Sequence, residues 1–139
     1  MTTLPISLDH VVIASSDLAR SDDFYFRVFD AEIGTPREDF HFYRIGMQQL
    51  NVHGPGLAAA VGPSLVARIP VAPGGSDICF EWHGPIAAAA RHLERCSVKI
   101  DSGPRATGGA KGAGTSVYFR DPDGSLLEFI SYAPHGEPA

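Results

Sequence analysis

The sequence predicts an α+β fold built of two similar modules, each with the order strand, helix and three strands. Two amphipathic helical segments and the alternation of apolar and polar residues around them support this prediction. The same order of elements also recurs after 67 residues, the interval from His10 to Asp77. That interval exceeds the usual periods of solenoid repeats, so two fused modules are expected within one domain of 139 residues.

The first module is expected over residues 6–71. Residues 7–14 alternate as a strand, and Ser15 to Asp17 offer an N-cap for the helix that follows. Its apolar stripe comprises Leu18, Phe24, Tyr25, Val28 and Phe29. Extended segments follow at 40–45 and 48–53, joined by a turn at Gly46 and Met47, and a further short strand is expected over 65–71.

The second module is expected over residues 75–133, beginning with a strand at 76–81. Pro85 is placed at the first position of the next helix. Extended segments are expected at 98–100, 115–119 and 125–132, with a tight turn over 121–124. Residues 54–75 are expected to be a poorly ordered linker, and residues 134–139 a flexible tail.

Composition and charge narrow the classes of partner. The net charge of −5 and the absence of a Lys or Arg cluster argue against nucleic acid and anionic membranes as partners. No apolar run reaches the length of a membrane span, and no secretory signal is seen at the N-terminus. A cytoplasmic location with reduced Cys79 and Cys96 is therefore expected.

The stretch QQLNVHG, residues 48–54, contains a polar strand face that ends in an imidazole. The proposed duplication places ionisable residues at four equivalent locations: His10 and Asp77 in the opening strands, His53 and Glu128 in the closing strands. Buried carboxylates and imidazoles are costly unless something compensates them, and a divalent cation would compensate all four together.

Each residue also has a structural reading. A single strand histidine is more often hydrogen-bonded than a ligand, and Glu128 alone could be an edge charge or a salt-bridge partner. As a set, two imidazoles with one or two carboxylates suit Zn(II), Ni(II), Co(II), Mn(II) or Fe(II). Such a set leaves coordination positions open, so it predicts a catalytic divalent metal ion.

Four segments together resemble a known family: LDHVVI, the helical FYFRVF, LNVH, and the closing VYFRDPDGSLLEFISY. They are similar to the vicinal oxygen chelate superfamily, which includes glyoxalase I, extradiol dioxygenases and the fosfomycin- and bleomycin-resistance proteins. The closest likeness is to small, single-unit glyoxalase-domain proteins. The resemblance implies a cupped mixed sheet with helices outside, around one metal bound by His10, His53 and Glu128. Asp77 stands where the family commonly has histidine, so it could be a ligand, a base or an acceptor behind the ligands.

The expected function is that of a metal-dependent enzyme of glyoxalase or lyase type, with Glu128 or Asp77 as the catalytic base. Two alternatives stay open: an Fe(II) extradiol-type dioxygenase, and a non-catalytic protein that sequesters a drug or metabolite. The expected partners are a small-molecule substrate and, by resemblance, a second copy in a homodimer.

Several other features carry weaker predictions. The glycine-rich segment 108–115 could be a lid that uses Arg105 and Lys111, or a solvated hairpin loop. Cys79 is expected on the face of Asp77, either near the metal or as a small apolar filler. The remaining histidines are expected at the surface: His41, His83, His92 and His135.

Overall fold

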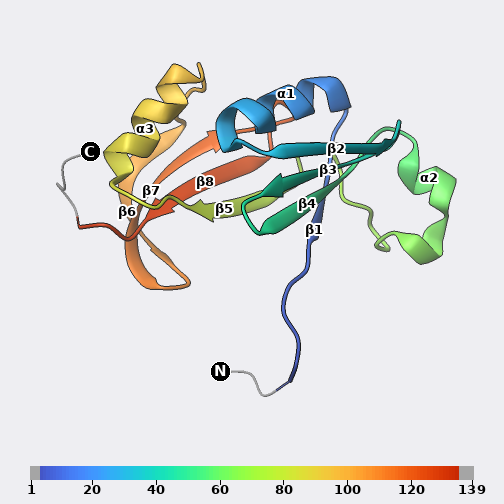
Figure 1. Ribbon diagram of the computed structural model, residues 1–139, viewed down its shortest axis with the longest axis horizontal. Coiled ribbons are helices and arrows are strands. Elements are labelled where there is room, and N and C mark those ends of the chain that lie inside the picture. The colour runs from blue at the N-terminus through green and yellow to red at the C-terminus, as the bar shows by residue number, and fades with distance from the viewer. Residues whose placement is uncertain (1–3, 135–139) are drawn as a thin grey trace. The chain divides into compact units, whose positions relative to one another are not determined.

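The computed structural model describes residues 4–134 and separates into two compact units, Met1–Ala72 and Pro73–Ala139. Each unit contains a four-stranded mixed sheet with a helix lying against it (Figure 1). The predicted α+β class with two βαβββ modules is confirmed. Residues 135–139, which hold His135 and most of the predicted tail, lie outside the described residues.

The first module contains β1 (Val11–Ala14), α1 (Leu18–Phe29), β2 (Glu32–Arg37), β3 (Phe40–Ile45) and β4 (Gln48–His53). The strand order is β1-β4-β3-β2, with β1 parallel to β4 and the other pairs antiparallel. The helix begins where the sequence predicts, because the Asp17 side chain accepts a hydrogen bond from the backbone N–H of Arg20.

A polar cluster fixes α1 to the sheet. Tyr43 of β3 is fully buried, and its ring stacks on Tyr25 of α1 at 4.8 Å between centroids. Its hydroxyl donates to Oδ1 of Asp22 at 2.7 Å, and Nδ1 of His41 lies 2.9 Å from Oδ2 of the same carboxylate. The expectation of a surface His41 is therefore wrong, because folding brings β3 beneath a helix 19 residues away in sequence.

Replacing Asp22→Ala should destabilise the first module. The buried Tyr43 hydroxyl and His41 both lose the carboxylate that they contact, which costs about 1–3 kcal/mol. The free energy of unfolding, measured by urea denaturation, provides the test. Tyr43→Phe is the matched control, since it removes the hydroxyl itself and should cost less. A larger loss for Tyr43→Phe than for Asp22→Ala would contradict this account.

The second module contains β5 (Asp77–Glu81), α3 (Ile86–Arg95), β6 (Ser102–Gly109), β7 (Gly112–Arg120) and β8 (Leu126–Ser131). The strand order is β5-β8-β7-β6, and β5 runs parallel to β8. The helix α3 packs against this sheet (Figure 1). Leu93 of α3 and alternate strand residues on the helix side form a buried core that includes Val117, Phe119, Leu127 and Phe129.

The structure corrects the expected strand at residues 65–71. The segment after β4 instead forms α2 (Leu57–Val61) and the 3-10 helix η1 (Pro63–Leu65), followed by irregular chain up to β5. Pro70 and Pro73 cannot donate to a strand ladder, and Ile69 is 86% exposed. The apolar pattern of this segment therefore does not reflect burial in a sheet.

Other element boundaries also differ from expectation. The first strand starts at Val11 rather than Ser7, and Leu8 before it is 82% exposed. Residues 98–100 precede the strand β6 instead of forming one. The glycine-rich segment expected as a loop or lid lies mainly within the β6–β7 hairpin, whose turn is at Ala110 and Lys111. Pro85 is the N-cap of α3 rather than its first residue.

Among residues 4–134, no helix combines the length and the apolar character needed to cross a membrane.

Candidate functional site

One face of the second sheet carries polar side chains from all four strands. The pairing of β8 with its neighbours sets Glu128 level with Cys79 on one side and with Tyr118 on the other. Side chains two residues apart share a face of a strand. The polar face of the second module is therefore defined by Asp77, Cys79, Glu81, Arg105, Thr107, Ser116, Tyr118 and Glu128.

Glu128 is half-buried and is oriented by a chain of hydroxyl groups. Ser116, which is fully buried, donates to Oε2 of Glu128 at 2.6 Å. Thr107 Oγ1 lies 2.6 Å from Ser116 Oγ. Because Ser116 has a single hydroxyl proton, and gives it to the carboxylate, Thr107 must be the donor in the second bond. This chain of hydroxyl groups fixes Oε2 of the carboxylate.

Two neighbours of Glu128, Cys79 and Tyr118, have raised pKa values. Burial, followed by the charge of Glu128 and a hydrogen bond to it, raises the pKa of the Cys79 thiol to about 12. The same three causes raise the pKa of Tyr118, while the charge of Arg105 acts in the opposite direction. Both groups therefore stay protonated near neutral pH and present hydrogen-bond donors on this face.

Asp77 begins β5 and is exposed. It lies two residues before Cys79, the residue level with Glu128, so both carboxylates are on the polar face of the second module. At the far end of β5, Glu81 is bound to Lys111 at 2.8 Å. The two predicted catalytic carboxylates, Asp77 and Glu128, thus share one face of this sheet, and Glu81 on the same face is paired with Lys111.

In the first module the polar face predicted for β4 is present. Gln49, Asn51 and His53 alternate with buried Leu50 and Val52. Gln49 donates to Oδ1 of Asn51 at 2.8 Å and accepts from Arg44 at 3.2 Å. Burial lowers the pKa of His53, and the charge of Asp39 only partly offsets this, so the His53 imidazole is neutral near pH 7.

His10 lies just before β1 and is exposed. Its Nδ1 is 2.8 Å from Oδ2 of Asp9. A carboxylate on one ring nitrogen orients the imidazole and leaves Nε2 available for a ligand or a metal ion.

The strand registers correct the predicted equivalence of His53 and Glu128. Val11 pairs with Leu50 in the first module, and Ile78 pairs with Leu127 in the second. Since Val11 and Ile78 are related by the 67-residue repeat, Leu50 corresponds to Leu127, and the next residue, Asn51, corresponds to Glu128.

The same register does not bring His10 and His53 together. His53 pairs with Ala14, four residues beyond His10 along the parallel strand. Four residues of strand span about 13 Å. Asn51 is thus the functional candidate that the sequence analysis missed. Aligning LNVH on LEFI, with Leu50 on Leu127, would have revealed it.

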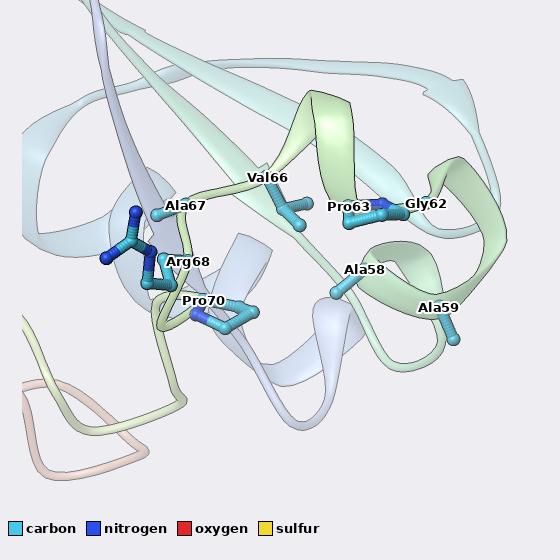
Figure 2. A pocket seen from close by; sticks show the side chains of 8 residues that line it. All are labelled: Ala58, Ala59, Gly62, Pro63, Val66, Ala67, Arg68 and Pro70. Carbon is cyan, nitrogen blue, oxygen red and sulfur yellow. The ribbon is translucent and has the colours of Figure 1, made fainter.

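Within residues 4–134, no cluster of three or more His, Cys, Asp or Glu side chains is arranged to hold a metal ion. A pocket of the first module lies between α2 and the chain that follows it (Figure 2). It is lined by Ala58, Ala59, Gly62, Pro63, Val66, Ala67, Arg68 and Pro70. Its lining contains none of the predicted ligands.

The profile of the Glyoxalase/Bleomycin resistance protein/Dioxygenase superfamily matches residues 7–129. The glyoxalase domain-containing protein RDO1 of Mycosarcoma maydis is 38% identical over 128 residues, which cover 91% of this chain and 68% of that protein. The virulence protein STM3117 of Salmonella typhimurium is 30% identical over 125 residues, which cover 90% of this chain and 83% of that protein.

Solved structures agree with this assignment. The structure of STM3117 superposes with a TM-score of 0.82 at 29% identity, covering 94% of this chain and all of that one. An integron cassette protein from V. cholerae gives 0.80 at 31% identity, covering 96% of this chain and all of that one. The resemblance seen in the sequence is thereby confirmed, and the chain belongs to the Glyoxalase/Bleomycin resistance protein/Dioxygenase superfamily.

Proposed function

We propose that the protein is a metal-dependent enzyme of glyoxalase or lyase type, acting on a small substrate that binds the cation through two adjacent oxygens. The observation that carries the proposal is the setting of Glu128. Its Oε2 accepts a hydrogen bond from the buried Ser116 hydroxyl, which fixes the orientation of the carboxylate. A carboxylate held in one orientation by neighbouring hydroxyls suits a metal ligand.

The donors fit the proposed divalent ion. The proposed ligands His10 and Glu128 supply an imidazole nitrogen and a carboxylate oxygen, and nitrogen with oxygen ligands suits Zn(II), Ni(II), Co(II), Mn(II) or Fe(II). Within the first module Asn51 occupies the register position that Glu128 occupies in the second, so we take Asn51 rather than His53 as the proposed donor from β4. When bound, the cation would stabilise negative charge that develops on the two substrate oxygens.

The remaining residues of the polar face have separate roles in this proposal. With Glu128 engaged as a ligand, Asp77 is the exposed carboxylate that can accept a proton from the substrate. Cys79, whose pKa is raised to about 12, is a hydrogen-bond donor and not a nucleophile.

The metal content of the full chain, purified without added metal, tests this proposal. We expect about one divalent cation per chain by elemental analysis. His10→Ala should weaken binding of that cation by more than about 100-fold, since it removes a nitrogen ligand and loss of a mere hydrogen-bond partner behind a ligand already costs roughly 10- to 100-fold. His53→Ala removes an imidazole of the same module and should change the affinity less than threefold. Wild-type protein that neither retains nor takes up a divalent ion would contradict the proposal.

The same protein distinguishes the two other candidate functions. Ring cleavage of catechol after anaerobic reconstitution with Fe(II) would identify an extradiol-type dioxygenase instead. A sequestering protein would keep its ligand affinity after the metal is removed, whereas an enzyme of the proposed type would lose turnover. Sedimentation velocity of the same sample tests the proposed homodimer.

A further inference from the structure

The cation Arg105 lies on the polar face of the second module. It pairs with Ser116 across the β6–β7 ladder, and directly paired residues of an antiparallel pair share a face. Ser116 contacts Glu128, the carboxylate at the centre of the proposed site. The charge of Arg105 also acts on Tyr118, the residue level with Glu128. Arg105 therefore lies beside the groups to which the proposed function assigns the chemistry.

Arg105 differs from the other basic groups near this sheet. Lys111 is bound to Glu81 at 2.8 Å, and Arg120 is bound to Asp101 at 3.0 Å. In the part of the chain that the structure describes, the side chain of Arg105 makes neither a hydrogen bond nor an ion pair. Glu128, a carboxylate on the same face, is hydrogen-bonded to Ser116 and forms no ion pair with Arg105.

An uncommitted guanidinium can bind an anion from solution. Its planar donors match the two oxygens of a carboxylate, with which it forms paired hydrogen bonds. The protein carries a net charge of −5, and three carboxylates lie on this face, so an anionic substrate needs a local cation to approach it. Arg105 is the cation on this face that is available for that task.

We propose that Arg105 binds a carboxylate group of the substrate, which makes the substrate class a small organic acid with two adjacent oxygens. The inference rests on the proposed function for the two oxygens, but the carboxylate contact itself does not require a metal ion. Arg105 then acts as a specificity residue that selects charged substrates over neutral analogues of the same shape.

Three aromatic probes separate these contributions in calorimetric titrations of the full chain as purified. Benzoate has only the carboxylate, catechol has only the adjacent oxygens, and 3,4-dihydroxybenzoate has both. We expect 3,4-dihydroxybenzoate to bind at least tenfold more tightly than catechol. Arg105→Gln should abolish that advantage, and Arg105→Lys should restore part of it because the charge returns without the planar pair of donors.

Lys111→Gln is the matched control, because Lys111 belongs to the same hairpin but is already paired with Glu81. This variant should still bind 3,4-dihydroxybenzoate at least tenfold more tightly than catechol. Equal affinities for catechol and 3,4-dihydroxybenzoate, or equal loss in Arg105→Gln and Lys111→Gln, would overturn the inference while leaving the metal proposal in place. Benzoate binding that depends on Arg105, without any catechol binding, would support the inference and count against the proposed function. Failure of all three probes to bind would overturn both.

Discussion

Glu128→Gln is expected to lose the bound cation and at least a hundredfold in turnover. The substitution keeps the size and shape of the side chain, and its amide oxygen can still accept the hydrogen bond from Ser116. Its amide nitrogen then stands where Oε1 of the carboxylate stood, and a donor N–H cannot coordinate a cation. Elemental analysis and a steady-state assay of the same preparation measure the two losses.

Glu81→Gln is the matched control for this substitution. It changes the charge of the same sheet by the same amount, but Glu81 is bound to Lys111 rather than to the Ser116 hydroxyl. The metal content of Glu81→Gln should remain within twofold of that of the wild type. The thermal midpoints of both variants should lie close to the wild-type midpoint. Equal metal loss in Glu81→Gln and Glu128→Gln would show that overall charge, and not a specific ligand, is responsible.

In the metal-free protein, where no cation offsets the charge of Glu128, Cys79 is expected to react with iodoacetamide roughly a thousandfold more slowly in the folded state than in urea at pH 8. The thiolate is the reactive form, and a pKa of about 12 leaves almost none of it at that pH. An unperturbed thiol, with a pKa of about 8.5, is already about one-quarter ionised there. Because the pKa of this acid is raised on folding, the slow rate should persist until the pH approaches 12.

Cys96→Ala provides a background with a single thiol for this measurement. Adding Glu128→Gln removes a negative charge that raises the pKa of Cys79, so the rate at pH 8 should increase at least tenfold. Mass spectrometry of the alkylated chain gives both rates. A folded-state rate within tenfold of the rate in urea would contradict the raised pKa of Cys79.

The main elements of both modules could be predicted from local pattern. The N-cap at Asp17 and the apolar stripe of α1 come from neighbouring residues, and the turn at Gly46 and Met47 is encoded within four positions. Such signals do not depend on the rest of the chain. The strand expected at 65–71 was wrong because its apolar residues were taken as a sign of burial. Whether an apolar residue is buried depends on tertiary packing, which is not encoded locally.

Glu128 could be found from the sequence because a carboxylate in an apolar strand is conspicuous. The side chains around it could not be predicted in that way. The buried hydroxyls of Ser116 and Thr107 that orient it come from two other strands, and serine or threonine in a strand carries no local signal of such a contact. The pairing of His41 with Asp22 was missed for the same reason, since the two residues belong to different elements.

The sequence by itself determined the fold class, the duplicated order of elements and the faces of the strands, because periodicity and capping act between residues a few positions apart. The tertiary structure alone decided the register. In a parallel pair joined by a long crossover, one strand can shift by two residues against the other. Such a shift changes the register but leaves every side chain on the same face of the sheet. That freedom is why His53 looked equivalent to Glu128, and the pairing of Val11 with Leu50 and of Ile78 with Leu127 assigned that position to Asn51.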